Sequence, residues 1–384
     1  MAWYVSYDKL GQKQLEVLNG ISGQLERPHW VQGFAGTGKT LVVTHLMERV
    51  AKLKPTSSIC FVTFTHALKD LVASGLQGSV AARVVIRTHT QYLRERTHYD
   101  YVFLDEVQDI SSDDLVRIKS LSGHLYIAGD GDQRIYDKGA SEREITAAVS
   151  PRTWKLLEIF RLTKLLQQVA QAIFPRTKLI EGLHSAKTAE VTVQLVQHVS
   201  SDREAAWVWK EASRRARPGD PTVILFPTHK AIAQFAGEVA QANRLGIPPA
   251  RGAKGDYGPF NEFWEESGLS LMYFGNNHGE LARGETEPMV YLMTFHSSKG
   301  LDFRNVFIPG MYDGATIVSR LALESDPELD QRLLFVAVTR SRENLFISYS
   351  GRAPHVLLKS LPSSVMAKSP AGGGSNRDSE EEFF

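Results

Sequence analysis

The chain has 384 residues, a formal net charge of +1, 42% hydrophobic and 23% charged residues. These proportions are those of an ordinary globular protein, and the length suits two or three compact domains. The single cysteine, Cys60, excludes an intramolecular disulfide and a thiolate metal cage. No apolar run approaches the roughly 20 residues that cross a bilayer, and the first ten residues lack the layout of a signal peptide. We therefore expect a soluble, cytoplasmic protein with no membrane partner.

Short apolar runs alternate with segments of helical periodicity in the first third of the chain. Between the first two runs, the segment LVVTHLMERVAKL repeats its apolar side chains at helical spacing. This alternation is typical of parallel strands joined by helices. The strands expected here are 29–32, 58–63, 83–86, 101–104 and 124–128.

The same alternation returns after about residue 220, and it predicts a second sheet. The expected strands are 222–226, 269–273, 289–294, 305–308 and 344–348, with helices at 231–242 and 329–337. We therefore expect an α/β protein with two domains, 1–157 and 158–360, each a parallel sheet flanked by helices. The segment 361–384 turns to Ser, Ala, Gly and Pro and then to acidic residues, so we expect a disordered tail.

Residues 33–40 read GFAGTGKT and match the phosphate-binding pattern Gly, four residues, Gly-Lys-Thr. Glycines let backbone N–H groups approach phosphate oxygens, and the helix that follows directs its positive end at them. We expect Lys39 to neutralise the β and γ phosphates of a nucleoside triphosphate and Thr40 to offer its hydroxyl to Mg²⁺. The other expected contacts in the loop are Gly33, Ala35, Gly36, Thr37 and Gly38.

Two later segments supply polar groups at the ends of expected strands. YVFLDEVQD places Asp105 to hold Mg²⁺ and Glu106 to orient and deprotonate the attacking water. Taken alone, these acids could equally cap the next helix. In GDGDQ, the Gln133 amide suits a sensor of the γ-phosphate, although Gly-Asp pairs are also common in turns.

In this order the motifs resemble those of the superfamily 1 helicases of the UvrD/Rep/PcrA kind. LGQKQLEVL resembles the family's adenine-reading segment, EIFRL the fragment usually written NYRS, and VYLMTFHSSKGLDF and LLFVAVTRSRENL the fifth and sixth motifs. The resemblance implies that ATP and Mg²⁺ lie in a cleft between two RecA-like P-loop domains. It implies nucleotide contacts from Gln14 and Phe160 to adenine, from Arg161 and the arginine finger Arg340 to the γ-phosphate, and from Gly300 and Asp302.

FVTFTHAL, IRTHTQYL and GDGDQRIY resemble the strand-binding motifs of the same family. Short hydroxyl and imidazole side chains after strands can bond phosphates without reading sequence, and Tyr136 offers a face on which a base stacks. The contacts implied are Thr65, His66, Thr88, His89, Tyr136, Thr294, His296 and Lys299. Five further aromatic residues have the helical spacing of core residues, so we expect them in the core; they lie at 207, 209, 260, 263 and 264.

The chain departs from the family in length. Few residues separate IRTHTQYL from the strand at 101, where the family has a large inserted subdomain, and the second insertion also looks absent or much reduced. We expect a compact, ATP-dependent translocase or helicase on single-stranded DNA that unwinds weakly; the resemblance implies movement from 3′ to 5′. An RNA-directed motor and an ATP-gated interaction switch remain open.

The C-terminal residues NRDSEEEFF place an acidic run before Phe383 and Phe384. This end resembles the interaction tips of bacterial single-strand-binding proteins, which implies a protein partner. A solvating acidic tail explains the charges equally well.

Overall fold

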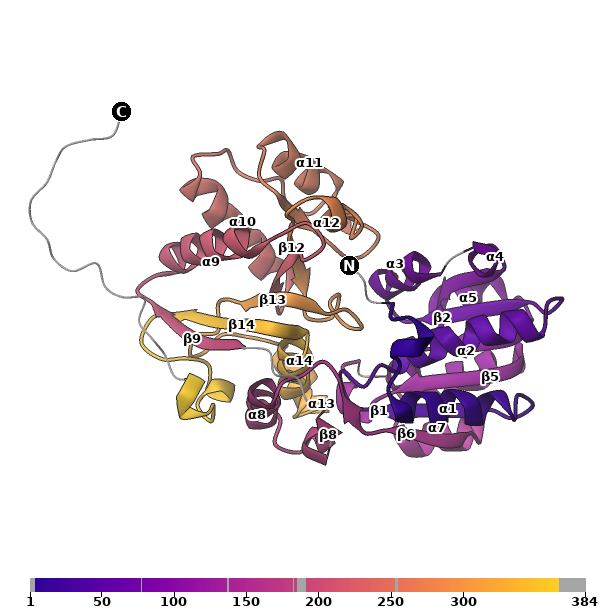
Figure 1. Ribbon diagram of the computed structural model, residues 1–384. Coiled ribbons are helices and arrows are strands. Elements are labelled where there is room, and N and C mark those ends of the chain that lie inside the picture. The colour runs from indigo at the N-terminus through magenta and orange to yellow at the C-terminus, as the bar shows by residue number, and fades with distance from the viewer. Residues whose placement is uncertain are drawn as a thin grey trace, which may run out of the picture.

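The computed structural model describes residues 4–76, 78–136, 138–181, 183–184, 191–252 and 255–365. Two six-stranded sheets form its framework, and every strand pair within them is parallel. Figure 1 shows the two sheets side by side, with helices against each. The expected fold class, two RecA-like domains with parallel sheets flanked by helices, is confirmed.

The first sheet has the strand order β3-β2-β4-β5-β1-β6. Its strands are β1 (His29–Gly33), β2 (Ile59–Thr63), β3 (Val84–Thr88), β4 (Tyr99–Leu104), β5 (Ser122–Gly129) and β6 (Arg152–Leu156). The helices of this half are α1 (Gln12–Ser22), α2 (Lys39–Leu53), α3 (His66–Gly75), α4 (Gly78–Ala81), α5 (His89–Glu95), α6 (Ser112–Ser120) and α7 (Glu142–Val149). Because β4, β5 and β1 are neighbours and parallel, the segments that follow them meet at one edge of the sheet.

The second sheet has the strand order β11-β12-β10-β13-β14-β9. Its strands are β9 (Thr192–His198), β10 (Thr222–Phe226), β11 (Leu271–Tyr273), β12 (Val290–Thr294), β13 (Phe303–Ile308) and β14 (Ser341–Ser350). The helices are α8 (Lys164–Ile173), α9 (Ser201–Arg215), α10 (His229–Ala242), α11 (Gly258–Glu266), α12 (Arg283–Thr286), α13 (Arg320–Ser325) and α14 (Leu329–Val338). Between the sheets, β7 (Glu158–Ile159) pairs with β8 (Leu183–His184).

Every strand that the sequence predicted is present, but two edge strands were missed. In β6, Arg152, Thr153 and Lys155 are exposed, and in β9 polar residues interrupt the buried ones. Edge strands are covered less completely than central strands, so their apolar pattern is weaker. The aromatic residues expected in the core lie there: Phe260 and Trp264 are buried in one hydrophobic cluster, and Trp207, Trp209 and Phe263 pack against that cluster.

The connections at the two expected insertion points are short. Helix α5 ends at Glu95 and β4 begins at Tyr99, while only α12 lies between β11 and β12. At the C-terminal end, Leu361 and Val365 are buried, so the ordered fold continues past residue 360. The rest of the expected tail, including Phe383 and Phe384, lies outside the described residues. Among the described helices, none is long and apolar enough to cross a membrane.

Candidate nucleotide and nucleic-acid sites

The phosphate-binding loop connects β1 to α2 and approaches its neighbours closely. Gly36 and Gly38 have φ angles of 80° and 82°, which side chains other than glycine rarely adopt. A Cβ atom at Gly36 would lie 2.8 Å from the Cβ of Arg161, and one at Gly38 would lie 2.4 Å from Nε2 of Gln14. The two glycines therefore allow segments distant in sequence to close around the loop.

Lys39 and Thr40 begin α2, whose N-terminus faces the loop. Lys39 Nζ donates to the carbonyl oxygens of Gly33 at 2.8 Å and Phe34 at 3.2 Å. Thr40 donates its hydroxyl to Asp105 Oδ2 at 2.6 Å. A hydroxyl beside a carboxylate is a donor set that suits Mg²⁺, which takes one or two protein ligands and keeps several waters.

Asp105 and Glu106 follow β4 and are both buried. Burial and the neighbouring Glu106 carboxylate raise the pKa of Asp105 to about 6. Burial acts in the same direction on Glu106, but the Lys299 and Lys39 cations together lower its pKa below the ordinary value. Gln108 fixes the Glu106 carboxylate by donating to Oε2 at 2.5 Å. Glu106 is therefore held as an oriented, ionised carboxylate.

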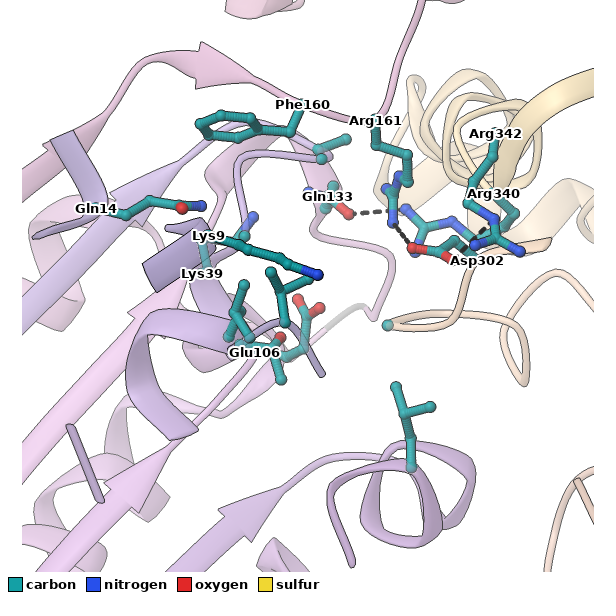
Figure 2. A pocket seen from close by; sticks show the side chains of 18 residues that line it. Lys9, Gln14, Lys39, Glu106, Gln133, Phe160, Arg161, Asp302, Arg340 and Arg342 are labelled. Atoms are coloured by element: carbon teal, nitrogen blue, oxygen red, sulfur yellow. Dashed lines mark hydrogen bonds and ion pairs between the residues drawn. The ribbon is translucent and has the colours of Figure 1, made fainter. Parts of the chain in front are cut away.

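Gln133 and Arg340 join the two halves of the chain. Gln133, after β5, donates to Asp130 at 2.7 Å and accepts from Arg340 Nη2 at 3.1 Å (Figure 2). Arg340 also donates to the carbonyl oxygens of Val336 and Leu301, and its side chain is 1% exposed. Burial and the Arg161 cation lower the pKa of Arg340, yet a guanidinium remains protonated at neutral pH.

Asp302 was expected to contact the nucleotide, but its carboxylate bonds two arginines. Arg161 donates to Oδ2 at 3.0 Å, and Arg342 Nε lies 3.5 Å from Oδ1 (Figure 2). Burial opposes ionisation, but these two cations lower the pKa of Asp302 below the ordinary value. Asp302 therefore positions Arg161, one of the residues that the resemblance directs at the γ-phosphate.

Gln14 and Phe160 lie beside the loop, where an adenine contact was expected. The Gln14 amide donates to the carbonyl oxygen of Thr37 and accepts from Gly11 N–H, both at 2.9 Å. The same Gln14 amide nitrogen carries a second N–H, which is the group that would read a base edge. Phe160 donates its backbone N–H to Gly36 at 3.0 Å, which holds the ring at the mouth of the loop.

These residues line one cavity of about 340 Å³, a size typical of small-molecule sites. Figure 2 shows side chains from both halves of the chain pointing into it. The cavity includes two cations that the motifs did not single out, Lys9 and Arg342. Of the expected contacts it contains Gln14, Ala35, Gly36, Gly38, Lys39, Thr40, Glu106, Gln133, Phe160, Arg161, Gly300, Asp302 and Arg340.

Three expected contacts lie behind this cavity rather than in its wall. Gly33 supports Lys39 through its carbonyl oxygen, and the buried Thr37 hydroxyl donates to Phe34 at 3.0 Å. Asp105 is fully buried and meets the cavity through the Thr40 hydroxyl and the Glu106 N–H, which both donate to its carboxylate. Gly300 does line the wall, with a φ of 83°, and a Cβ there would lie 3.0 Å from the Leu68 side chain.

A second groove, of about 450 Å³, crosses between the two halves. It brings together five of the residues expected to bind a strand: Thr65, His66, Tyr136, Thr294 and His296. Thr228, His229 and Asn276 also line it, although no motif indicated them. They follow β10 and β11, so a search for polar residues after every predicted strand could have found them.

Lys299 and Thr88, both expected on the strand path, have buried side chains and do not line the groove. Lys299 is 1% exposed, and its amine bonds the Asp109 carboxylate and the carbonyl oxygen of Gln133, with Glu106 Oε2 3.7 Å away. Thr88 is 2% exposed, and its hydroxyl caps α5 by accepting from Gln91 N–H at 3.3 Å. A motif position does not reveal whether a polar side chain turns inward, so the sequence alone could not separate these residues from the groove.

Three aromatic rings form a row at one end of this groove. The Phe64 ring centroid lies 4.1 Å from that of Tyr136 and 4.5 Å from that of His89. Across the boundary, His296 lies 5.4 Å from Tyr136. Phe64 was not among the expected residues, although it directly follows β2 inside the segment FVTFTHAL.

Two family models match separate parts of the chain. An AAA domain matches residues 20–138, and a UvrD-like helicase C-terminal domain matches residues 260–352. The first range contains the phosphate-binding loop, Glu106 and Gln133, and the second contains Asp302 and Arg340. Fold and site together thus define a P-loop protein with two RecA-like domains.

Named relatives match over shorter ranges. The ATP-dependent DNA helicase PcrA of Staphylococcus aureus (strain Mu50 / ATCC 700699) is 31% identical over 130 residues, 30% of this chain and 18% of that protein. The ATP-dependent DNA helicase Rep of Buchnera aphidicola subsp. Acyrthosiphon pisum (strain APS) is 36% identical over 89 residues, 22% of this chain and 14% of that protein. With both domain models, these matches show that the chain belongs to the UvrD/Rep/PcrA-like family of superfamily 1. The matched part spans less than a fifth of either relative.

Solved structures resemble the chain more weakly. Arterivirus nonstructural protein 10 (helicase), solved in complex with DNA, is 17% identical with a TM-score of 0.42, and the match covers 88% of this chain and 62% of that one. The PRRSV helicase is 16% identical with a TM-score of 0.42, covering 87% and 54%. Because both TM-scores are low, the fold assignment rests on the strand order of this chain and on the family models.

Proposed function

We propose that the chain hydrolyses ATP in the cavity between its two sheets and uses the motion of that cleft to move along single-stranded DNA. The observation that carries this proposal is the composition of the cavity wall. Lys39 and Glu106 come from the first domain, whereas Arg340 comes from the segment before β14. A site completed only when two domains meet couples chemistry to their closure.

The side chains have the chemistry that phosphoryl transfer needs. Lys39 and Arg340 would stabilise the charge that develops on the transferred phosphoryl group, a contribution of about 10³–10⁵ in rate for an arginine finger. Glu106, kept ionised by nearby cations, would orient the water and accept its proton. Gln133 contacts Arg340 directly, so it would report the γ-phosphate to both domains.

Mg²⁺ belongs to the proposal through the paired oxygens of Thr40 and Asp105. The bound cation would neutralise charge on the phosphates. Nearby, Gln14 and Phe160 would select adenine, and the loop residues 33–38 would bond the phosphates. We also propose domain limits of 1–157 and 158–360, because β6 ends at Leu156 and β7 belongs to a separate small sheet.

Single-stranded DNA is the substrate we propose for the groove, because the named relatives are DNA helicases. The Tyr136 and Phe64 rings would stack bases, and His66 and His296 would contact phosphates. We propose movement from 3′ to 5′, the direction that the resemblance implies. We propose weak unwinding because the points where the family carries insertions are short here. A cytoplasmic location and a protein partner for the C-terminal tip remain parts of the proposal.

The test is steady-state ATPase activity with Mg²⁺, with and without saturating oligonucleotides. The proposal expects stimulation by single-stranded DNA and loss of all hydrolysis in Glu106→Gln. Stimulation by RNA alone would assign the groove to an RNA-directed motor. Hydrolysis unaffected by either nucleic acid would contradict the motor and favour an ATP-gated interaction switch. Displacement of labelled blocks from either end of an oligonucleotide would then decide the direction.

A further inference from the structure

A shallow basic hollow of about 640 Å³ lies on the first domain, beside α5 and α6. We call it the arginine hollow; Arg94, Arg96 and Arg117 line it, together with His89 and Asp114. None of the motifs includes these arginines. We infer that a nucleic-acid strand leaving the interdomain groove continues into this hollow, where the arginines bind its phosphates. The inference rests on the proposed function and extends its binding site.

The hollow continues the groove through one shared wall. Phe64 lines the groove, its ring stacks on His89 at 4.5 Å with an interplanar angle of 16°, and His89 lines the hollow. On its other side Phe64 contacts Tyr136. Aromatic side chains along a path accept bases whatever their sequence, and these rings form an unbroken aromatic wall from the groove to the hollow. A strand that stacks along this row therefore reaches the hollow without a turn away from the protein.

The charges of the hollow suit a polyanion. Asp114 pairs with Arg117 at 2.9 Å, which leaves that pair nearly neutral. Arg94 and Arg96 are exposed, and among the described residues no carboxylate lies within ion-pair distance of either guanidinium. Two unpaired cations beside an aromatic row fit a strand with a phosphate at every nucleotide.

The backbone at Arg96 supports a role for its side chain. Arg96 ends α5 with a φ of 52°, in the left-handed region where glycine or asparagine is usual. A side chain there is strained relative to glycine. The connection that follows α5 is short, because β4 begins at Tyr99. It leaves the hollow open to a nucleic-acid strand.

The test compares oligonucleotides of about 4 to about 16 nucleotides, the range of common single-strand sites. Anisotropy of labelled oligonucleotides gives Kd at several salt concentrations for the parent chain and for Arg94→Gln/Arg96→Gln. Arg203→Gln/Arg352→Gln is the control, because both arginines are exposed and belong to the second domain. Removing two phosphate contacts should reduce the salt slope for long oligonucleotides by about 1.4 and weaken their binding about tenfold.

The groove alone accommodates the shortest oligonucleotides. Their Kd and salt slope should therefore be the same for both double variants as for the parent chain. A hollow variant that keeps the parent salt slope and affinity at every length would overturn the inference, even though the groove still bound DNA. An equal loss in the control variant would also overturn it, because the effect would then come from net charge. If the parent chain bound no oligonucleotide of any length, the proposed function itself would fail.

Discussion

Lys299→Met is expected to open the interdomain cleft. The Lys299 amine lies on the segment after β12 and bonds the Asp109 carboxylate of the first domain. The side chains of Lys299 and Asp109 are 1% and 0% exposed. Methionine has nearly the same length, so the substitution removes the charge with little change in packing. It leaves Asp109 buried and without its cation.

The size of the effect follows from burial and distance. Removing one partner of a buried ion pair costs about 3–5 kcal/mol. The attraction to Glu106, 3.7 Å from the amine, is itself worth about 4 kcal/mol at an effective dielectric constant of about 20. Opening the cleft returns the carboxylate to water and avoids this cost, and interdomain interfaces commonly permit such motion. The population should therefore shift towards the open form.

Small-angle X-ray scattering measures that shift. A compact chain of this length has a radius of gyration of about 21 Å, and Lys299→Met should exceed the parent value while keeping the same circular dichroism. Lys299→Met/Asp109→Leu removes both charges and should return towards the parent radius. If the single variant scattered as the parent chain does, the ion pair would not hold the domains together.

Two further substitutions test the site, and a third tests Glu204, a buried carboxylate of α9. Lys39→Ala should reduce kcat by at least about 10²–10³, the loss typical of one charge-stabilising donor; unchanged hydrolysis would contradict its role at the phosphates. Asp302→Asn should lower kcat by about 10- to 100-fold through misplacement of Arg161. This fold-loss in kcat should be the same with ATP as with 2′-deoxy-ATP. A different fold-loss for the two nucleotides would indicate that Asp302 contacts the ribose. Burial raises the pKa of Glu204 above its ordinary value of 4.5, so its contribution to stability is present below pH 4.5 and is lost as the pH rises through the raised pKa. Urea unfolding of Glu204→Gln should therefore vary less with pH above 4.5, and an unchanged pH profile would refute this.

The central strands and the phosphate-binding loop could be predicted because their sequence patterns are local. An apolar run such as 59–63 is buried on both faces and needs no partner to be recognised. Glycines at 36 and 38 are required by the φ angles of the loop itself. The clustering of Lys39, Glu106 and Gln133 followed from the strand ends that carry them, since parallel neighbours share one edge.

The partners of individual side chains could not be predicted, because contacts between the domains set them. Asp302 and Lys299 share one motif, yet Asp302 bonds two arginines and Lys299 turns to a carboxylate 190 residues earlier. Thr88 has the local sequence of a helix cap as well as that of a phosphate contact, and capping accounts for its hydroxyl. Phe64 gains its importance only from His89 and Tyr136, which belong to other loops.

The most direct test of the account is ATP hydrolysis by Arg340→Ala in the presence of single-stranded DNA. Arg340 lies in the second domain and reaches Gln133 of the first, so it completes the site only when the cleft is closed. We expect the variant to keep its affinity for DNA and to lose about 10³-fold or more in stimulated kcat. Stimulated hydrolysis at the parent rate would contradict a catalytic site shared between the two domains.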